Sequence, residues 1–202
     1  MNELVALTGH AGHGKDTIVR ILSEDFGFTR ISFADPVREM CLAVDPYCPL
    51  ITEDTYSCSR LSFIVREFGW DEAKKNPIVR EYLQRMGTEA VRNILGEHIW
   101  ANLAMRKCAE VRRAAISDLR FPNEESAIKN NNGIIWRVER TGFVNSVGTS
   151  HASEAYSDKI KFDELIINDG TIENLRTKIH ALVLNIWGWQ YEGEANETEL
   201  SA

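Results

Sequence analysis

The sequence lacks any run of about 18 consecutive apolar residues, so it predicts no helix that spans a membrane. It has little cysteine, and none of it forms a CxxC pair. Neither a zinc site nor a disulfide framework is favoured. We expect the cysteines to be reduced thiols that pack against other side chains, at Cys41, Cys48, Cys58 and Cys108. The segment MNELVALTGH has no basic start and no long apolar stretch, so we expect no secretion signal and a cytoplasmic location.

The chain has no excess of positive charge, because 23 Lys and Arg face 30 Asp and Glu and the net charge is −7. Four of the glutamates lie in residues 190–202, which contain no Lys or Arg, so residues 1–189 carry −3. Neither a nucleic-acid polymer nor a membrane is therefore expected as a partner. Phosphate binding at a local site stays open, since 15 of the 23 cations are Arg. The acidic segment 190–202 predicts a disordered tail.

Short apolar runs alternate with amphipathic segments, which is typical of an α/β protein with a parallel sheet. We expect strands at 4–7, 28–33, 114–118, 134–138 and 165–167. Helices are expected from 17, at 36–44, 78–95 and 97–113, and after 170. Residues 46–77, with three prolines, predict an irregular insertion over the sheet. With 44% hydrophobic residues, the chain can bury its own core, and we interpret 1–189 as a single domain.

A glycine-rich motif lies between the first strand and the first helix, where residues 9–15 read GHAGHGK and fit G-x-x-x-x-G-K. Its glycines allow the backbone to wrap a phosphate chain with the N–H groups inward, and Lys15 can neutralise the phosphate oxygens. An ordinary glycine-rich turn would not explain the lysine and the flanking pattern together. The motif predicts phosphate contacts from Gly9, Gly12, His13, Gly14, Lys15, Asp16 and Thr17.

Three side chains are candidates for positioning Mg²⁺: Asp16, Thr17 and Asp118. Asp16 stands where Ser or Thr usually follows the lysine, so it could hold the metal or contact the phosphoryl acceptor. It could equally do no more than complement the positive end of the helix, and the sequence leaves both interpretations open. Asp118 closes an apolar strand, where a carboxylate that positions Mg²⁺ is expected, although such a residue also forms turns.

Beyond this loop, the sequence resembles the bacteriophage deoxynucleoside monophosphate (dNMP) kinases, a branch of the P-loop nucleoside monophosphate kinases. The resemblance covers most of residues 1–180 and rests on LTGHAGHGKDT (7–17), SFADPVREM (32–40), LQRMGTEAVRNILGEHIW (83–100), ISDLRFPNE (116–124), HASE (151–154) and INDGT (167–171). It implies transfer of the ATP γ-phosphoryl to the 5′-phosphate of a dNMP, with Mg²⁺, in the host cytoplasm if a phage encodes the chain.

The resemblance also implies a P-loop NTPase three-layer fold, with a five-stranded parallel sheet in the order 2-3-1-4-5 flanked by helices. An insertion at 46–113 would then contain the helices that bind the nucleoside monophosphate, and 140–155 would form a lid that excludes water. In HASE, we expect His151 to orient Glu154 or to begin a short helix. Whether the protein forms a homodimer stays open.

The helix expected at 78–95 carries Gln84, Thr88 and Arg92 at four-residue spacing. A different face, which we expect to pack, holds Leu83, Met86, Ala90 and Ile94. The polar face alone fits a solvated surface. Together with the resemblance it predicts a dNMP site made of Asp35, Arg38, Gln84, Arg85, Thr88, Trp100, Arg120 and Arg137, in which Trp100 stacks on the base. Asp35 also fits a helix N-cap and Trp100 a core position.

Catalysis is assigned to Lys15, Asp16, Arg120 and Arg140. At least one arginine is needed near the transfer point, because two anionic phosphates must be brought together. Arg120 could instead be a surface cation paired with Glu124 or Glu125. Asn168 and Gly170 resemble the turn that contacts adenine in related kinases, and they also fit a cap between strand and helix.

Two rival functions remain. One is another small-molecule P-loop kinase, such as a dephospho-coenzyme A kinase, which would share the loop, a lid and the turn at 168–171. The other is a nucleotide-gated binding protein without phosphoryl transfer, in which residues 46–77 would form a partner surface.

Overall fold

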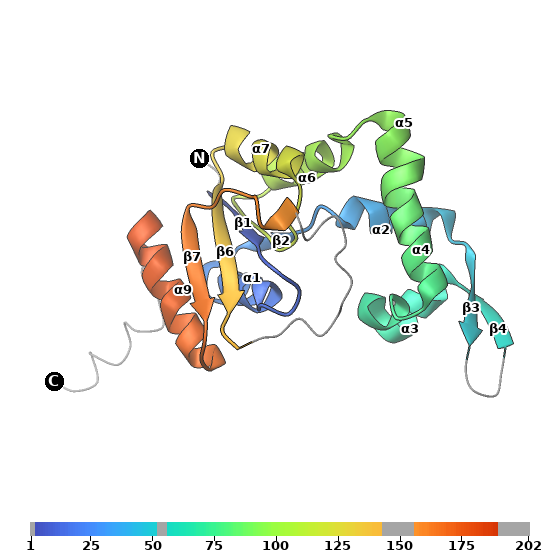
Figure 1. Ribbon diagram of the computed structural model, residues 1–202, viewed down its shortest axis with the longest axis horizontal. Helices are drawn as coiled ribbons and strands as arrows, with labels where there is room; N and C mark the ends of the chain where they lie inside the picture. The colour runs from blue at the N-terminus through green and yellow to red at the C-terminus, as the bar shows by residue number, and fades with distance from the viewer. Residues whose placement is uncertain (1–2, 52–55, 143–155, 190–202) are drawn as a thin grey trace. The chain divides into compact units, whose positions relative to one another are not determined.

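The structure, a computed structural model, describes residues 3–51, 56–142 and 156–189 (Figure 1). The chain divides into two compact units, one made of residues 1–32 and 105–202 and the other of residues 33–104. The predicted tail at 190–202 and most of the predicted lid, with His151 and Glu154, lie outside the described residues. No helix in the described parts combines the length and the apolar character that crossing a membrane requires.

The first unit is built on a five-stranded parallel sheet. Its strands are β1 (Glu3–Thr8), β2 (Thr29–Ile31), β5 (Arg113–Ile116), β6 (Ile134–Arg140) and β7 (Glu164–Asn168). They lie in the order β2-β5-β1-β6-β7. Counted among the strands of this sheet alone, the order is 2-3-1-4-5, which confirms the prediction. Asp118 lies two residues beyond β5 and does not close it.

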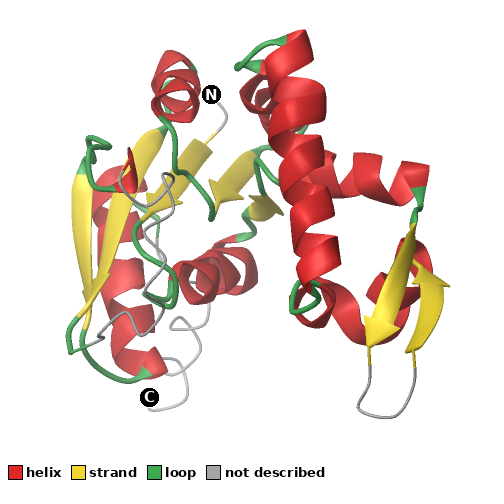
Figure 2. Ribbon diagram, turned by 45° about the vertical axis from the view of Figure 1, so that its right-hand side comes forward, coloured by secondary structure: helices red, strands yellow, loops and turns green. Residues whose placement is uncertain are grey.

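Helices cover both faces of this sheet, giving the three-layer arrangement of a P-loop fold (Figure 2). Helices α1 (Lys15–Phe26) and α9 (Ile172–Trp187) pack on the face that carries Val5 and Leu7. Successive strand residues point to opposite faces, so Leu4 points the other way, toward α7 (Pro122–Asn130). The layers place the carboxyl end of β1 and the beginning of α1 at one edge of the sheet, where the glycine-rich loop connects them.

The second unit is helical with one hairpin. It contains α2 (Asp35–Val44), the antiparallel strands β3 (Tyr47–Ile51) and β4 (Tyr56–Arg60), α3 (Leu61–Ala73), α4 (Pro77–Arg85), the π-helix η1 (Met86–Arg92), α5 (Asn93–Leu95) and the first residues of α6 (Ile99–Ala109). Its core includes Cys41, Cys48, Leu61, Ile64 and Val79. The cysteines at 41 and 48 are therefore packing residues, as predicted, and Cys108 is buried too, but the prediction is wrong for Cys58, which is exposed on β4.

The prediction of an irregular segment at 46–77 is wrong. The segment forms the β3–β4 hairpin and helix α3. Its prolines do not prevent this, because Pro49 lies in a two-stranded sheet where the missing N–H can face away from the partner strand, and Pro77 starts α4 at a position where no intrahelical N–H bond is required. Gly69 has a non-helical backbone (φ 75°, ψ 168°) inside α3 and marks a kink.

The predicted packing face of the 78–95 helix is confirmed as far as Met86 and wrong beyond it. Leu83 and Met86 pack against the core of the second unit, whereas Ala90 is exposed and Ile94 is 73% exposed; the buried side chains are Val79 and Val91. The cause is the π-helix η1, whose i→i+5 turns are wider than those of an α-helix. Side chains after Met86 therefore point in other directions around the helix axis than a regular α-helix would give them. A pattern based on 3.6 residues per turn therefore loses its phase in the middle of this helix.

Candidate functional site

The glycine-rich loop is held close to strand β6. Gly9 has φ 133°, and a Cβ atom built there would lie 2.3 Å from the carbonyl oxygen of Val138. Only glycine tolerates both this backbone conformation and this approach. The start of the loop therefore lies directly against the backbone of β6, an interior strand of the sheet.

Lys15 folds back over the loop. Its Nζ donates to the carbonyl oxygens of Gly9 and His10, each at 2.7 Å. These two bonds tie the ammonium group, which comes from the first residue of α1, back to the start of the loop. Phosphate oxygens could replace the carbonyls as acceptors, and this is the position expected for a charge that neutralises the donor phosphates.

Two histidines brace the loop. The His13 side chain is buried, and its Nδ1 donates to the Val138 carbonyl oxygen at 3.1 Å. His10 Nε2 lies 3.1 Å from Asp158 Oδ1, and the two imidazole rings meet edge to face at 5.3 Å. Through these contacts, both imidazole rings fill and brace the loop.

A cavity of about 390 Å³ opens beside the loop. It brings together residues that are far apart in sequence: the loop and helix start, the end of β6, and the turn after β7. Its lining is Gly12, Gly14, Lys15, Asp16, Thr17, Arg140, Asn168, Gly170, Thr171, Ile172 and Leu175. The structure thus gathers into one site most of the predicted phosphate-binding residues, the predicted arginine at 140 and the two predicted adenine-side residues.

The donor groups of this cavity fit Mg²⁺ in the way nucleotide sites hold it. Asp16 is exposed on the first turn of α1 and Thr17 follows it, both lining the cavity. Asp118 lies outside this lining, half-buried, and accepts a hydrogen bond from the Ser32 hydroxyl at 2.5 Å. Among the described residues, no three His, Cys, Asp or Glu side chains cluster as metal ligands. Mg²⁺ needs no such cage, since it is commonly held by one or two carboxylates, phosphates and water.

The two other arginines predicted in the first unit have different surroundings. Arg120 is exposed, and its backbone N–H donates to Glu124 Oε2 at 2.9 Å. Arg137 has a side chain only 12% exposed, and its Nη2 donates to the carbonyl oxygen of Ser157 at 2.7 Å. The assignment of Arg137 to the dNMP site is therefore not supported, because its guanidinium is used to fasten the segment after residue 156.

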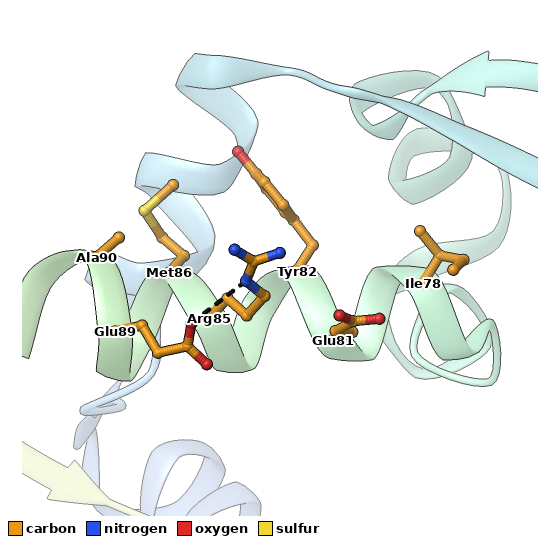
Figure 3. A pocket seen from close by; sticks show the side chains of 7 residues that line it. All are labelled: Ile78, Glu81, Tyr82, Arg85, Met86, Glu89 and Ala90. Atoms are coloured by element: carbon orange, nitrogen blue, oxygen red, sulfur yellow. Dashed lines mark ion pairs between the residues drawn. The ribbon is translucent and has the colours of Figure 1, made fainter.

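The predicted acceptor residues of the second unit fall into two groups. Asp35 and Arg38 pair with each other at 3.0 Å, near Trp70. Arg85 lies in a groove of about 620 Å³ along α4 and η1 and pairs with Glu89 at 3.4 Å (Figure 3). The groove is lined by Ile78, Glu81, Tyr82, Arg85, Met86, Glu89 and Ala90. Gln84 and Thr88 are exposed but are not part of this lining.

Trp100 does not present a face to a base. It is 2% exposed, and its indole N–H donates to the carbonyl oxygen of Gly87 at 2.7 Å. Gly87 belongs to η1 and lies close to Val37 of α2. Trp100 therefore supports the wide turn of the helix, and the prediction that it stacks on a base is corrected to this role.

Sequence reasoning missed several residues of these sites. Glu81 and Tyr82 line the groove, and their spacing from Arg85 on one helix could have indicated them. Burial, together with the neighbouring Cys41 and Cys48, raises the pKa of the Tyr82 phenol. Asp158 had no signal, since only the fold brings it to His10.

Comparison with known proteins adds the family. A family model described as deoxynucleotide monophosphate kinase matches residues 51–179. The chain belongs to the deoxynucleotide monophosphate kinase family. A protein of Acanthamoeba polyphaga mimivirus that carries the name of a deoxynucleotide monophosphate kinase is 30% identical over 192 residues, which cover 90% of this chain and 96% of the relative. Membership of this family supports the assignment of this chain as a nucleotide kinase.

Solved structures show more distant likeness. A dephospho-CoA kinase from Campylobacter jejuni is 17% identical and aligns over 92% of this chain and 98% of its own, with a TM-score of 0.44. A sugar kinase from a Janibacter species is 15% identical over 93% and 96% of the two chains, with a TM-score of 0.43.

Proposed function

We propose that this member of the deoxynucleotide monophosphate kinase family transfers the γ-phosphoryl group of MgATP to the 5′-phosphate of a dNMP, producing a dNDP and ADP. The observation that carries the proposal is the cavity beside the phosphate loop. It joins Lys15, the helix N-terminus and Arg140 to the turn after β7, where Gly170 lies, so one site offers partners to both ends of a nucleoside triphosphate.

Lys15 and the loop amides would bind the donor phosphates. In the transfer, a phosphate oxygen of the dNMP forms a bond to the γ-phosphorus while the bond to the β,γ-bridging oxygen breaks, and negative charge develops on the ADP leaving group. In the structure, the Lys15 ammonium donates to the carbonyl oxygens of Gly9 and His10. With ATP bound, it would donate to the β- and γ-phosphate oxygens in their place. Catalysis would then rest on positioning and on charge stabilisation.

Mg²⁺, when bound with ATP, would neutralise charge on the β- and γ-phosphates. Asp16 and Thr17 would hold it, directly or through water, because both line the cavity at the first turn of α1. Asp118, whose carboxylate accepts from Ser32, remains a candidate for orienting a metal-bound water. Arg120 and Arg140 would meet the negative charge of the transferring group.

The second unit would bind the dNMP. Arg85 is the cation in its groove, and a nucleotide phosphate could replace Glu89 as its partner, because an exposed ion pair is worth only about 0–1 kcal/mol. Asp35, Arg38, Gln84 and Thr88 remain candidates for contacts with the sugar, base or phosphate. The exposed faces of Gln84 and Thr88 leave their polar groups available for such contacts.

The test is a coupled assay of ADP formation with dTMP, dGMP, dCMP, dAMP and dephospho-coenzyme A, each with MgATP. We expect turnover that depends on at least one dNMP and that disappears in Lys15→Met. Turnover with dephospho-coenzyme A alone would show the rival kinase. ATP hydrolysis that is indifferent to every acceptor would contradict the proposal, and ribonucleotide controls would define selectivity for the sugar.

A further inference from the structure

Asn168 links the turn after β7 to the phosphate loop. It is the last residue of β7, and its Nδ2 donates to the carbonyl oxygen of His13 at 3.0 Å, across 155 positions of sequence. Sequence reasoning placed this residue on the adenine side of the site. The structure instead directs its amide group at the loop backbone.

This hydrogen bond orients one peptide unit of the loop. The His13 carbonyl and the Gly14 N–H belong to the same planar trans peptide, so they point in opposite directions. Holding the carbonyl oxygen on Asn168 therefore turns the Gly14 N–H away from Asn168. Gly14 directly precedes Lys15 and lines the cavity, so its N–H is one of the donors at the N-terminus of α1.

Gly14 and Asn168 are matched in shape. Gly14 has φ 101°, and a Cβ atom placed on it would lie 2.5 Å from Asn168 Nδ2. The absence of a side chain at position 14 therefore makes room for the asparagine amide. The Asn168 amide therefore both donates to the His13–Gly14 peptide and lies against Gly14.

Both sides of this link are anchored. On the loop side, His13 Nδ1 donates to the Val138 carbonyl oxygen of β6 at 3.1 Å. On the other side, Lys178 of α9 donates to the Ile167 carbonyl oxygen at 2.8 Å and to Asp169 Oδ1 at 2.6 Å, which fastens the turn around Asn168. A hydrogen bond between two fastened segments can hold a peptide orientation before any ligand binds.

We propose that Asn168 is a positioning residue that presets the His13–Gly14 peptide so that the Gly14 N–H faces the phosphates of the donor nucleotide. This inference rests on the proposed function only in naming a nucleoside triphosphate as the ligand. A direct contact of Asn168 with the base would act on the nucleoside, whereas a preset peptide acts on the phosphates. The two roles therefore differ in which part of ATP is affected.

The experiment measures binding of ATP, tripolyphosphate and adenosine to the full chain and to Asn168→Ala and Asn168→Leu, the second of which keeps much of the side-chain volume but cannot donate. In both variants we expect affinity for ATP and for tripolyphosphate to fall about tenfold, which corresponds to about 1.4 kcal/mol, with adenosine unchanged. Lys178→Met is the matched control, because it loosens the same turn but leaves the Asn168 donor in place, and it should lose less affinity for tripolyphosphate than either Asn168 variant.

Three results would overturn the inference: an equal loss of adenosine affinity, which indicates a base contact; unchanged affinity for tripolyphosphate; or the same loss in Lys178→Met. A wild-type protein that binds neither ATP nor tripolyphosphate would also overturn it. A protein that binds both but transfers no phosphoryl group to a dNMP would contradict only the proposed function.

A double-mutant cycle tests the shape match independently of any ligand. Gly14→Ala should destabilise the wild-type chain through both backbone strain and the collision with Asn168, but in the Asn168→Ala background only the strain should remain. We therefore expect a smaller loss of melting temperature in that background. Equal losses in the two backgrounds would show that Asn168 does not occupy the space beside Gly14.

Discussion

Replacing Gly9 with alanine should destabilise the first unit in two separable ways. The backbone at Gly9 has φ 133°, which an alanine adopts only with strain of about 1–3 kcal/mol. The new Cβ would also lie 2.3 Å from the Val138 carbonyl oxygen, and this oxygen belongs to the backbone of a central strand pair that cannot move aside cheaply. Overpacking of this kind costs about 1–3 kcal/mol more.

Gly96 provides the matched control. It has a similar φ of 108°, but a Cβ atom there would meet no atom within 4 Å. Gly96→Ala should therefore show the backbone strain alone, and Gly9→Ala should lose about 1–3 kcal/mol more. Urea unfolding followed by tryptophan fluorescence checks this, because both units carry tryptophans. Trp136, Trp187 and Trp189 lie in or against the core of the first unit, and Trp70 and Trp100 lie in the second, which contains Gly96.

Gly9→Ala should also impair ATP binding, because the displaced Gly9 carbonyl oxygen accepts from Lys15 Nζ. Gly96→Ala should bind ATP normally. If the two variants proved equally stable and bound ATP equally well, the close approach of the loop to β6 would be refuted.

Three further outcomes are expected. Lys15→Met should reduce kcat about 100-fold or more, about 3 kcal/mol, without loss of fold by circular dichroism, and near-normal turnover would exclude the loop as the donor site. Asp16→Asn should melt near the wild type yet turn over far more slowly with altered Mg²⁺ dependence; retention of kcat across a magnesium titration would make this carboxylate structural. Cys58 is exposed, whereas burial raises the pKa of Cys41 to about 11 and that of Cys108 to about 12, so the two buried thiols remain protonated at pH 8. Iodoacetamide should therefore react first with Cys58, which mass spectrometry of the labelled peptides would show.

Much of the first unit could be predicted because its signals are local. The run Leu4–Leu7 has no polar residue, as expected for a strand covered on both faces, and the glycine-rich loop follows it directly. Phosphate binding by Lys15 and its neighbours needs only contiguous residues between a strand and a helix, so the motif already indicated where the cavity would lie.

The second unit was predicted less well. Prolines at 46, 49 and 77 suggested irregular structure, although a two-stranded hairpin and a helix start can both accept proline. The π-helix at Met86–Arg92 left no pattern in hydrophobicity, and it moved Ile94 out of the expected packing face.

The sequence by itself therefore determined the order of strands and helices of the sheet unit, the phosphate loop and the family, because each depends on neighbouring residues or on an ordered set of motifs. Only the tertiary structure decided which distant side chains meet. Asn168 donates to the loop across 155 positions of sequence, Arg137 donates to the carbonyl oxygen of Ser157, and Trp100 donates to that of Gly87. Such pairings depend on how strands and helices pack, and a short polar side chain has the same local signature whether it faces a ligand, a backbone carbonyl or water.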